Sequence, residues 1–121
     1  MWSRCSRAES LCRGSVAAVA DVVASKGGLP IRLTDERWAH VTEEHSELAG
    51  WRLDVLEAIG APDRVLAGSM GDLLAVRELE PGKHLVVVYR EEEADGFIIT
   101  AFMTRRLRQL ERRRQVWPPL N

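Results

Sequence analysis

The chain of 121 residues has few cysteines, no long apolar run and little net charge, and each shortage excludes a class of protein. Its two cysteines, Cys5 and Cys12, lie near the start of the chain, where a disulfide would close a small loop and do little for a fold. They have neither the CxxC spacing nor the neighbouring histidine of a metal site. We therefore expect two free thiols in a reducing cytoplasm, with no metal and no cofactor.

The sequence also lacks the apolar run of about 18–20 residues that a membrane-spanning helix requires, so we expect no membrane association. Residues 15–25 follow a basic stretch and resemble an export signal in outline. Asp21 interrupts the apolar run and Glu9 interrupts the basic stretch, which disfavours export. The remaining interpretations of this segment are a short amphipathic or frayed helix and an over-extended start site.

Motifs for nucleotide binding and for acyl transfer are missing as well. The glycines at positions 60, 68 and 71 have neither the GxGxxG nor the GxxxxGK spacing of a phosphate-binding loop. None of the serines stands in the GxSxG context of a nucleophile elbow. NTP hydrolysis and acyl transfer are therefore disfavoured.

The net charge of −1 hides an uneven distribution. Residues 1–104 carry 11 basic and 17 acidic side chains, whereas residues 105–121 carry six arginines and one glutamate. The basic tail permits three interpretations: an amphipathic helix that packs through Leu107 and Leu110, an arm that contacts nucleic-acid phosphates, or a segment that pairs with acidic helices. A small net charge therefore does not exclude a nucleic-acid ligand.

Glycine and proline at residues 27–30 interrupt any regular structure and mark a domain boundary. We expect residues 1–29 to form an arm, either helical or disordered, and residues 30–121 to form a single domain. The length of the chain fits one domain.

Within that domain the apolar residues first repeat with the period of helices and then with the period of strands. Thr34 is a suitable N-cap for a helix that ends at Gly50, and a second helix follows at residues 51–60. Strands are expected at residues 64–68, 73–79, 84–90 and 97–104, and a basic helix at residues 105–114. The predicted fold is α+β: two N-terminal helices packed on a four-stranded antiparallel sheet, followed by a C-terminal basic helix.

Two histidines, His40 and His45, fall on the first predicted helix. Five residues correspond to about 140° of rotation, so the two side chains point to different faces, and the spacing of four found in zinc proteases is absent. His40 and Glu44 are four apart and can pair. Each histidine is interpreted either as a proton-transfer group or as a structural residue, with His40 solvated and His45 packed between Val41 and Leu48.

Polar residues on the predicted strands complete a candidate site. Alternate residues of a strand share a face, so Arg77 shares its face with apolar neighbours, which is unusual for a solvated arginine. If the strands pair in the matching register, Arg77, Tyr89 and Thr100 meet on one open face, and a slip of one residue separates them. A guanidinium binds a phosphate through two hydrogen bonds and stabilises developing charge. The alternative is that Arg77 is an edge-strand charge and the threonines are ordinary strand formers.

The chain resembles a group of small prokaryotic and phage-associated domains in five segments, in the order RLTDERWAHVTEEHSEL, APDRVL, LLAVRE, HLVVVYRE and DGFIITAFMT. These domains are grouped with the barnase–EndoU–colicin–RelE superfamily, the BECR fold, of metal-independent ribonucleases that are often toxins. The resemblance covers about residues 31–117 and implies helices packed on a four-stranded antiparallel sheet. It matches His40 and His45 to helix histidines, Arg77 to a strand arginine, and Thr100 and Thr104 to hydroxyls of the last strand.

We therefore expect a cytoplasmic, metal-independent RNA endonuclease, of the kind that serves as the toxin of a toxin–antitoxin or phage-linked system. The expected catalytic residues are His40, His45, Arg77, Tyr89, Thr100 and Thr104. Either histidine acts as general acid or base, Arg77 holds the scissile phosphate, and Tyr89 and Thr100 position it. The arginines expected to bind the nucleic-acid backbone are Arg90, Arg105, Arg106 and Arg108.

RNA is the expected substrate, an antitoxin or immunity protein is an expected partner, and a homodimer is left open. The alternative function is a non-enzymatic module of the same fold that binds protein or nucleic acid. A weaker alternative is a metal-dependent hydrolase with a metal ion at His40 and Glu44. The binding module is favoured if the histidines lie far from Arg77 and Thr100 with no concave surface between them.

Overall fold

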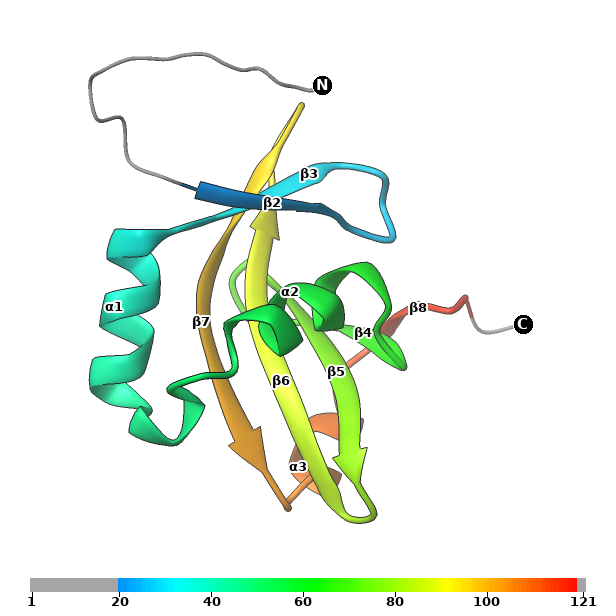
Figure 1. Ribbon diagram of the computed structural model, residues 1–121. Helices are drawn as coiled ribbons and strands as arrows, with labels where there is room; N and C mark the ends of the chain where they lie inside the picture. Colours follow the sequence, from blue (N-terminus) through cyan, green and yellow to red (C-terminus); the bar gives the residue numbers. More distant parts are fainter. Residues whose placement is uncertain (1–19, 120–121) are drawn as a thin grey trace, which may run out of the picture.

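A computed structural model describes residues 20–119 and shows two short helices and a one-turn helix arranged around a single sheet (Figure 1). In chain order the elements are β2 (Ala20–Ala24), β3 (Pro30–Thr34), α1 (Asp35–Glu44), the 3₁₀ turn η1 (Ser46–Leu48), α2 (Arg52–Gly60), β4 (Arg64–Ala67), β5 (Leu73–Glu80), β6 (Lys83–Glu91), β7 (Gly96–Thr104), α3 (Arg108–Glu111) and β8 (Gln115–Trp117).

The sheet has seven strands in the order β2-β3-β7-β6-β5-β4-β8. All neighbours are antiparallel except β3 and β7, which pair in parallel through Ile31 with Gly96 and Arg32 with Phe97. The antiparallel meander of β4 to β7 follows from β-branched runs separated by turns, of which Gly82 with φ of 82° closes the one between β5 and β6.

The four-stranded antiparallel sheet predicted from the sequence is therefore wrong, although the α+β class is correct. Two strands precede the helices, so α1 and α2 are not N-terminal, and the parallel pair of β3 and β7 makes the sheet mixed. The basic helix expected at residues 105–114 is reduced to α3, because residues 115–117 continue as β8 alongside β4. Pro30 begins β3, where its missing N–H is tolerated at a strand end.

The segment preceding β3 contains a strand, whereas the sequence left open a short helix, a disordered arm and an over-extended start site. Residues 20–24 of the segment 15–25 form β2, which runs antiparallel to β3. The turn between them contains Gly28 with φ of 85°, a conformation that glycine adopts without strain. The rest of the predicted arm, including Cys5 and Cys12, lies outside the described residues.

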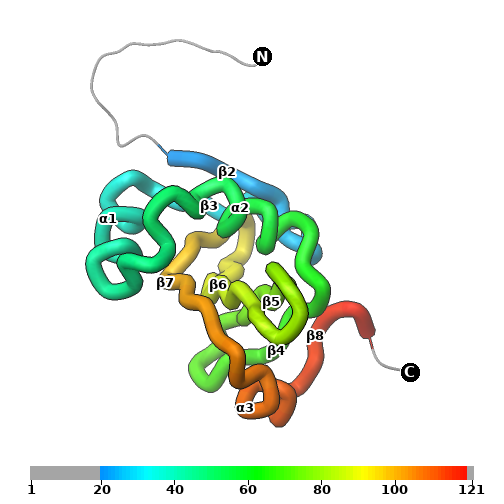
Figure 2. The backbone as a smooth tube through the Cα atoms, turned by 60° about the horizontal axis from the view of Figure 1, so that its bottom comes forward, coloured from blue at the N-terminus to red at the C-terminus, as the bar shows by residue number. Residues whose placement is uncertain are grey.

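The two faces of the sheet are covered differently. We call one face the α2 face, because α1, η1 and α2 bury it, and the other the α3 face, because Leu107 and Leu110 beside α3 pack on part of it. Figure 2 shows α2 and α3 on opposite sides of β6. The main core lies on the α2 face and contains Ile31, Leu33, Val41, Leu48, Val55, Ile59, Leu85, Val87 and Tyr89. The smaller core lies on the α3 face and contains Leu66, Leu74, Val76 and Val86.

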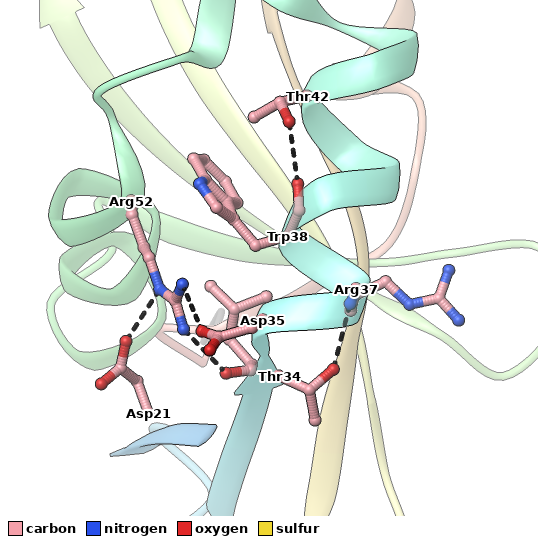
Figure 3. A network of polar contacts seen from close by, with 8 residues as sticks. Asp21, Thr34, Asp35, Arg37, Trp38, Thr42 and Arg52 are labelled. Atoms are coloured by element: carbon pink, nitrogen blue, oxygen red, sulfur yellow. Dashed lines mark hydrogen bonds and ion pairs between the residues drawn. The ribbon is translucent and has the colours of Figure 1, made fainter. Parts of the chain in front are cut away.

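A polar network holds the start of α1 against its neighbours (Figure 3). Thr34 is the N-cap, as its residue type predicted, and its hydroxyl accepts a hydrogen bond from the Arg37 backbone N–H at 3.0 Å. The Arg52 guanidinium contacts the carboxylates of Asp21 at 2.8 Å and of Asp35 at 2.7 Å. Arg52 therefore connects α2 to β2 and to α1.

Candidate functional site

A pocket of about 260 Å³ lies at one end of the sheet, where β6 begins and β7 ends. Its lining residues come from three separate parts of the chain: Glu47, Lys83, Met103, Thr104 and Arg105. We call it the η1–β7 pocket. It forms because β6 and β7 pair antiparallel, which places the start of one strand beside the end of the other, and because η1 packs against β7.

The η1–β7 pocket has a cationic side and a hydroxyl. Lys83 and Arg105 supply the positive charges, and Arg105 also lies 3.1 Å from Glu80 in an exposed ion pair. The Thr104 Oγ1 accepts a hydrogen bond from the backbone N–H of Arg106 at 2.9 Å. Because a hydroxyl both accepts and donates, this bond leaves the Thr104 O–H available to a ligand.

His45 does not line the η1–β7 pocket itself but lies beside one of its lining residues, Glu47. It is the C-cap of α1, with a non-helical φ of −131° and ψ of 74°, and its backbone N–H donates to the Val41 carbonyl at 2.8 Å. Its Nδ1 lies 3.6 Å from the Glu47 carboxylate, and its ring centroid lies 6.3 Å from that of Phe102 on β7. The side chain is 34% exposed, so solvent and ligands reach the imidazole.

A second histidine lies beside Thr104 on the α3 face. His84 on β6 is opposite both Thr104 on β7 and Glu78 on β5, so the three residues form a row across the sheet. The His84 Nε2 is 3.9 Å from the Glu78 carboxylate, and its buried Nδ1 has no hydrogen-bond partner within residues 20–119. Its side chain is only 12% exposed, and His84 is not among the residues that line the pocket.

Arg77 and Tyr89 share a face of the sheet, but it is the covered α2 face and not an open one. Arg77 donates from Nη1 to the Ala61 carbonyl at 2.8 Å and lies 4.0 Å from Glu57, so it caps the C-terminal end of α2. Tyr89 is 1% exposed within the main core. Thr100 is opposite Val88 and lies on the α3 face, where its hydroxyl is buried. The three residues therefore do not meet.

The other sequence candidates divide between the two ends of the sheet. Thr104 and Arg105 line the η1–β7 pocket, His45 lies beside its lining residue Glu47, and Arg106 and Arg108 follow along the chain. His40 is exposed on α1, whereas Arg90 is exposed near the opposite end of β6. A concave surface thus exists at Thr104, but neither a histidine nor Arg77 lines it.

Sequence reasoning missed three residues of this region: Glu47, Lys83 and His84. Glu47 has no role in the sequence analysis, although its spacing of two from His45 allows contact once the helix has ended. Lys83 lies between the predicted strands 73–79 and 84–90, and His84 begins the second of them. Their convergence depends on the β6–β7 register, which has no local signature in the sequence.

Tyr89 was expected to be catalytic, but it is buried in the main core, where it gives the fold a pH dependence. Burial raises the pKa of its phenol, and the Glu91 carboxylate raises it further. The folded chain therefore holds the phenolic proton more tightly than the unfolded chain, whose tyrosine titrates near pH ~10. The stability from this difference is fully present below pH ~10 and is lost as the pH rises above it.

We accordingly expect the free energy of unfolding to fall more steeply above pH ~10 in the wild type than in Tyr89→Phe, by up to about 1.4 kcal/mol per pH unit. Tyr89 is the only tyrosine of the chain, so no other phenol contributes. Urea unfolding of both proteins between pH ~8 and ~11, followed by circular dichroism, measures the difference. Parallel curves for the two proteins would contradict this assignment.

Within residues 20–119, no helix is long and apolar enough to cross a membrane. The same part of the chain holds no group of three or more His, Cys, Asp or Glu side chains arranged to bind a metal ion. Comparisons with protein-family models, with curated proteins and with solved structures gave no significant match. The function must therefore be argued from the chemistry of the site.

Proposed function

We propose that the protein is a metal-independent ribonuclease whose active site is the η1–β7 pocket. The observation that carries the proposal is that a carboxylate, a hydroxyl and two cations line one open pocket and that the His45 imidazole lies 3.6 Å from that carboxylate. Cleavage of RNA through its own 2′-hydroxyl needs a proton acceptor, a proton donor and positive charge at the phosphate. His45 and Glu47 supply the first two, and Lys83 and Arg105 supply the third.

The reaction follows from these positions. Glu47 accepts the proton of the ribose 2′-hydroxyl, whose oxygen attacks the adjacent phosphorus. The bond from phosphorus to the 5′ oxygen of the next nucleotide breaks, and His45 donates a proton to that leaving oxygen. Lys83 and Arg105 neutralise the charge that develops on the phosphate, and the Thr104 hydroxyl donates to one of its oxygens. The products are a 2′,3′-cyclic phosphate and a free 5′-hydroxyl.

The charge distribution supports a polyanionic substrate at this end of the molecule. Residues 35–60, which contain α1 and α2, carry seven acidic and two basic side chains. Residues 105–119, which follow β7 and contain α3, carry six arginines and one glutamate. The pocket lies between these two segments, with its hydroxyl and cations contributed by the strand ends next to α3. A nucleic-acid backbone is therefore attracted towards the arginine-rich side.

The proposal is tested with purified protein, a labelled single-stranded RNA and excess EDTA. We expect cleavage in EDTA, a cyclic phosphate on the product, and no cleavage of the same sequence made as DNA, because DNA lacks the 2′-hydroxyl. Cleavage of DNA, or activity only after a divalent metal is added, would contradict the mechanism. Binding of RNA without cleavage would instead support the non-enzymatic module.

A further inference from the structure

A phenylalanine between two arginines lies at the opposite end of β7 from the pocket. Phe97 on β7 is the register partner of Arg32 on β3 and of Arg90 on β6. Register partners point to the same face of a sheet, and the buried neighbours Ile31 and Ile98 belong to the core of the α2 face. The three side chains therefore form a row on the α3 face, which we call the Phe97 row.

The side chains of the Phe97 row are accessible. Phe97 is only partly buried and packs against neither core cluster of residues 20–119, unlike Phe102, which packs beside Leu107 and Leu110. The Arg32 side chain is 44% exposed, and Arg90 is exposed. An aromatic side chain that contributes to no core and stands between two cations has the composition of a nucleic-acid-binding surface.

The backbone holds this row in place. A Cβ on Gly96 would collide with the Arg90 carbonyl and with Ile31, so glycine at this position allows β3, β7 and β6 to approach closely. Arg32 forms an ion pair with Asp95, and a Cβ on Gly71 would lie 3.5 Å from the Arg90 guanidinium. Asp95 and Gly71 thus lie next to the guanidinium groups of the two arginines.

We propose that the Phe97 row binds single-stranded RNA, with one unpaired base stacked on Phe97 and the flanking phosphates contacted by Arg32 and Arg90. This inference rests on the proposed ribonuclease function for its choice of ligand. Stacking on an aromatic ring requires a base that is free of its partner strand, so the surface selects single strands over duplexes.

The distance to the pocket defines the length of RNA involved. Phe97 and Thr104 are near opposite ends of β7, and seven residues of strand span roughly 23 Å. A stacked strand that advances about 3.4 Å per nucleotide covers this distance in about seven nucleotides. Substrates with a single-stranded extension of that length therefore engage both sites, whereas a dinucleotide engages only the pocket.

The binding test uses a fluorescein-labelled 12-nucleotide RNA in which every ribose is 2′-O-methylated, because the blocked 2′ oxygen prevents cleavage. Fluorescence anisotropy is measured for the wild type, Phe97→Leu, Arg90→Gln and the control Arg37→Gln, which removes an exposed arginine of α1. We expect about tenfold weaker binding for Phe97→Leu. We expect Arg90→Gln to lower the slope of log K against log salt by about one, and Arg37→Gln to match the wild type.

Thermal unfolding of each variant separates folding from binding, and Arg90→Gln, at an exposed position, tests the surface even if Phe97→Leu unfolds. Equal affinity of Phe97→Leu and the wild type would overturn the proposal, as would the absence of RNA binding by the wild type. Binding that depends on Phe97 without any cleavage of unmodified RNA would support the Phe97 row and reject the ribonuclease. Cleavage of unmodified RNA, together with RNA binding that is unchanged in Phe97→Leu and Arg90→Gln, would support the ribonuclease and reject the Phe97 row.

Discussion

The variants His45→Gln and Glu47→Gln should each cleave RNA about 10²–10⁴-fold more slowly than the wild type, because a positioned proton-transfer group usually contributes that much to the rate. The two side chains are 3.6 Å apart at the η1–β7 pocket, where both are accessible. Each substitution also removes one limb of the pH–rate profile, because each group must be in a different protonation state for the reaction to begin. A merely structural role for either residue would lower the rate without changing the shape of the profile.

Two matched controls are available on α1. His40→Gln removes an exposed histidine, and Glu36→Gln removes an exposed glutamate of the first helical turn. Both should retain the wild-type rate under single-turnover conditions with RNA in EDTA. Loss of activity in His40→Gln together with full activity in His45→Gln would move the active site away from the η1–β7 pocket.

The second large effect is on stability, at Arg77. Removing its guanidinium in Arg77→Met leaves the Ala61 carbonyl at the end of α2 without its charged donor, which lies at 2.8 Å. Because the side chain is 34% exposed, we expect a loss of about 1.5 kcal/mol in the free energy of unfolding, the lower end for a hydrogen bond to a charged group. The 4.0 Å contact with the exposed Glu57 adds little.

Urea unfolding of Arg77→Met measures this loss, and the control is Arg37→Met, in which an exposed arginine of α1 is replaced. RNA cleavage is then measured on the same two proteins at a temperature where both are folded. Arg77→Met should be less stable but fully active. An inactive Arg77→Met of unchanged stability would restore this arginine as the group that holds the scissile phosphate.

The parts of the fold that the sequence predicted are those with strong local patterns. The strands β5, β6 and β7 follow from runs of β-branched residues with turns between them, and Thr34 follows from its preference for the N-cap. The strand β3 has the alternating burial of Ile31 and Leu33, but it is five residues long and begins at a proline. The three residues of β8 carry too short a pattern to predict a strand.

The site was predicted less well because its residues meet through tertiary pairing. Alternation correctly placed Arg77 among apolar neighbours, yet it does not tell which face of the sheet the helices cover. His45 lies beside Glu47, which lines the same pocket as Thr104, because α1 ends at Glu44 and η1 turns the chain towards the end of β7. Glu47 joins them through the same turn, so its role depends on a helix end that the sequence pattern placed at Gly50.

The short parallel contact between β3 and β7 has a consequence for the order in which the sheet is assembled. The hairpin of β2 and β3 meets β7 at only two register positions, and the ion pair of Arg32 with Asp95 joins residues 63 apart in sequence. Contacts between such distant residues form late in folding, because a long loop must close before they give any stabilisation. We expect β4 to β7 to form a sheet first, with the hairpin docking afterwards through Arg52 and β3. Arg32 then reaches Phe97 only in this last step, so the Phe97 row lacks one of its two cations until the hairpin has docked.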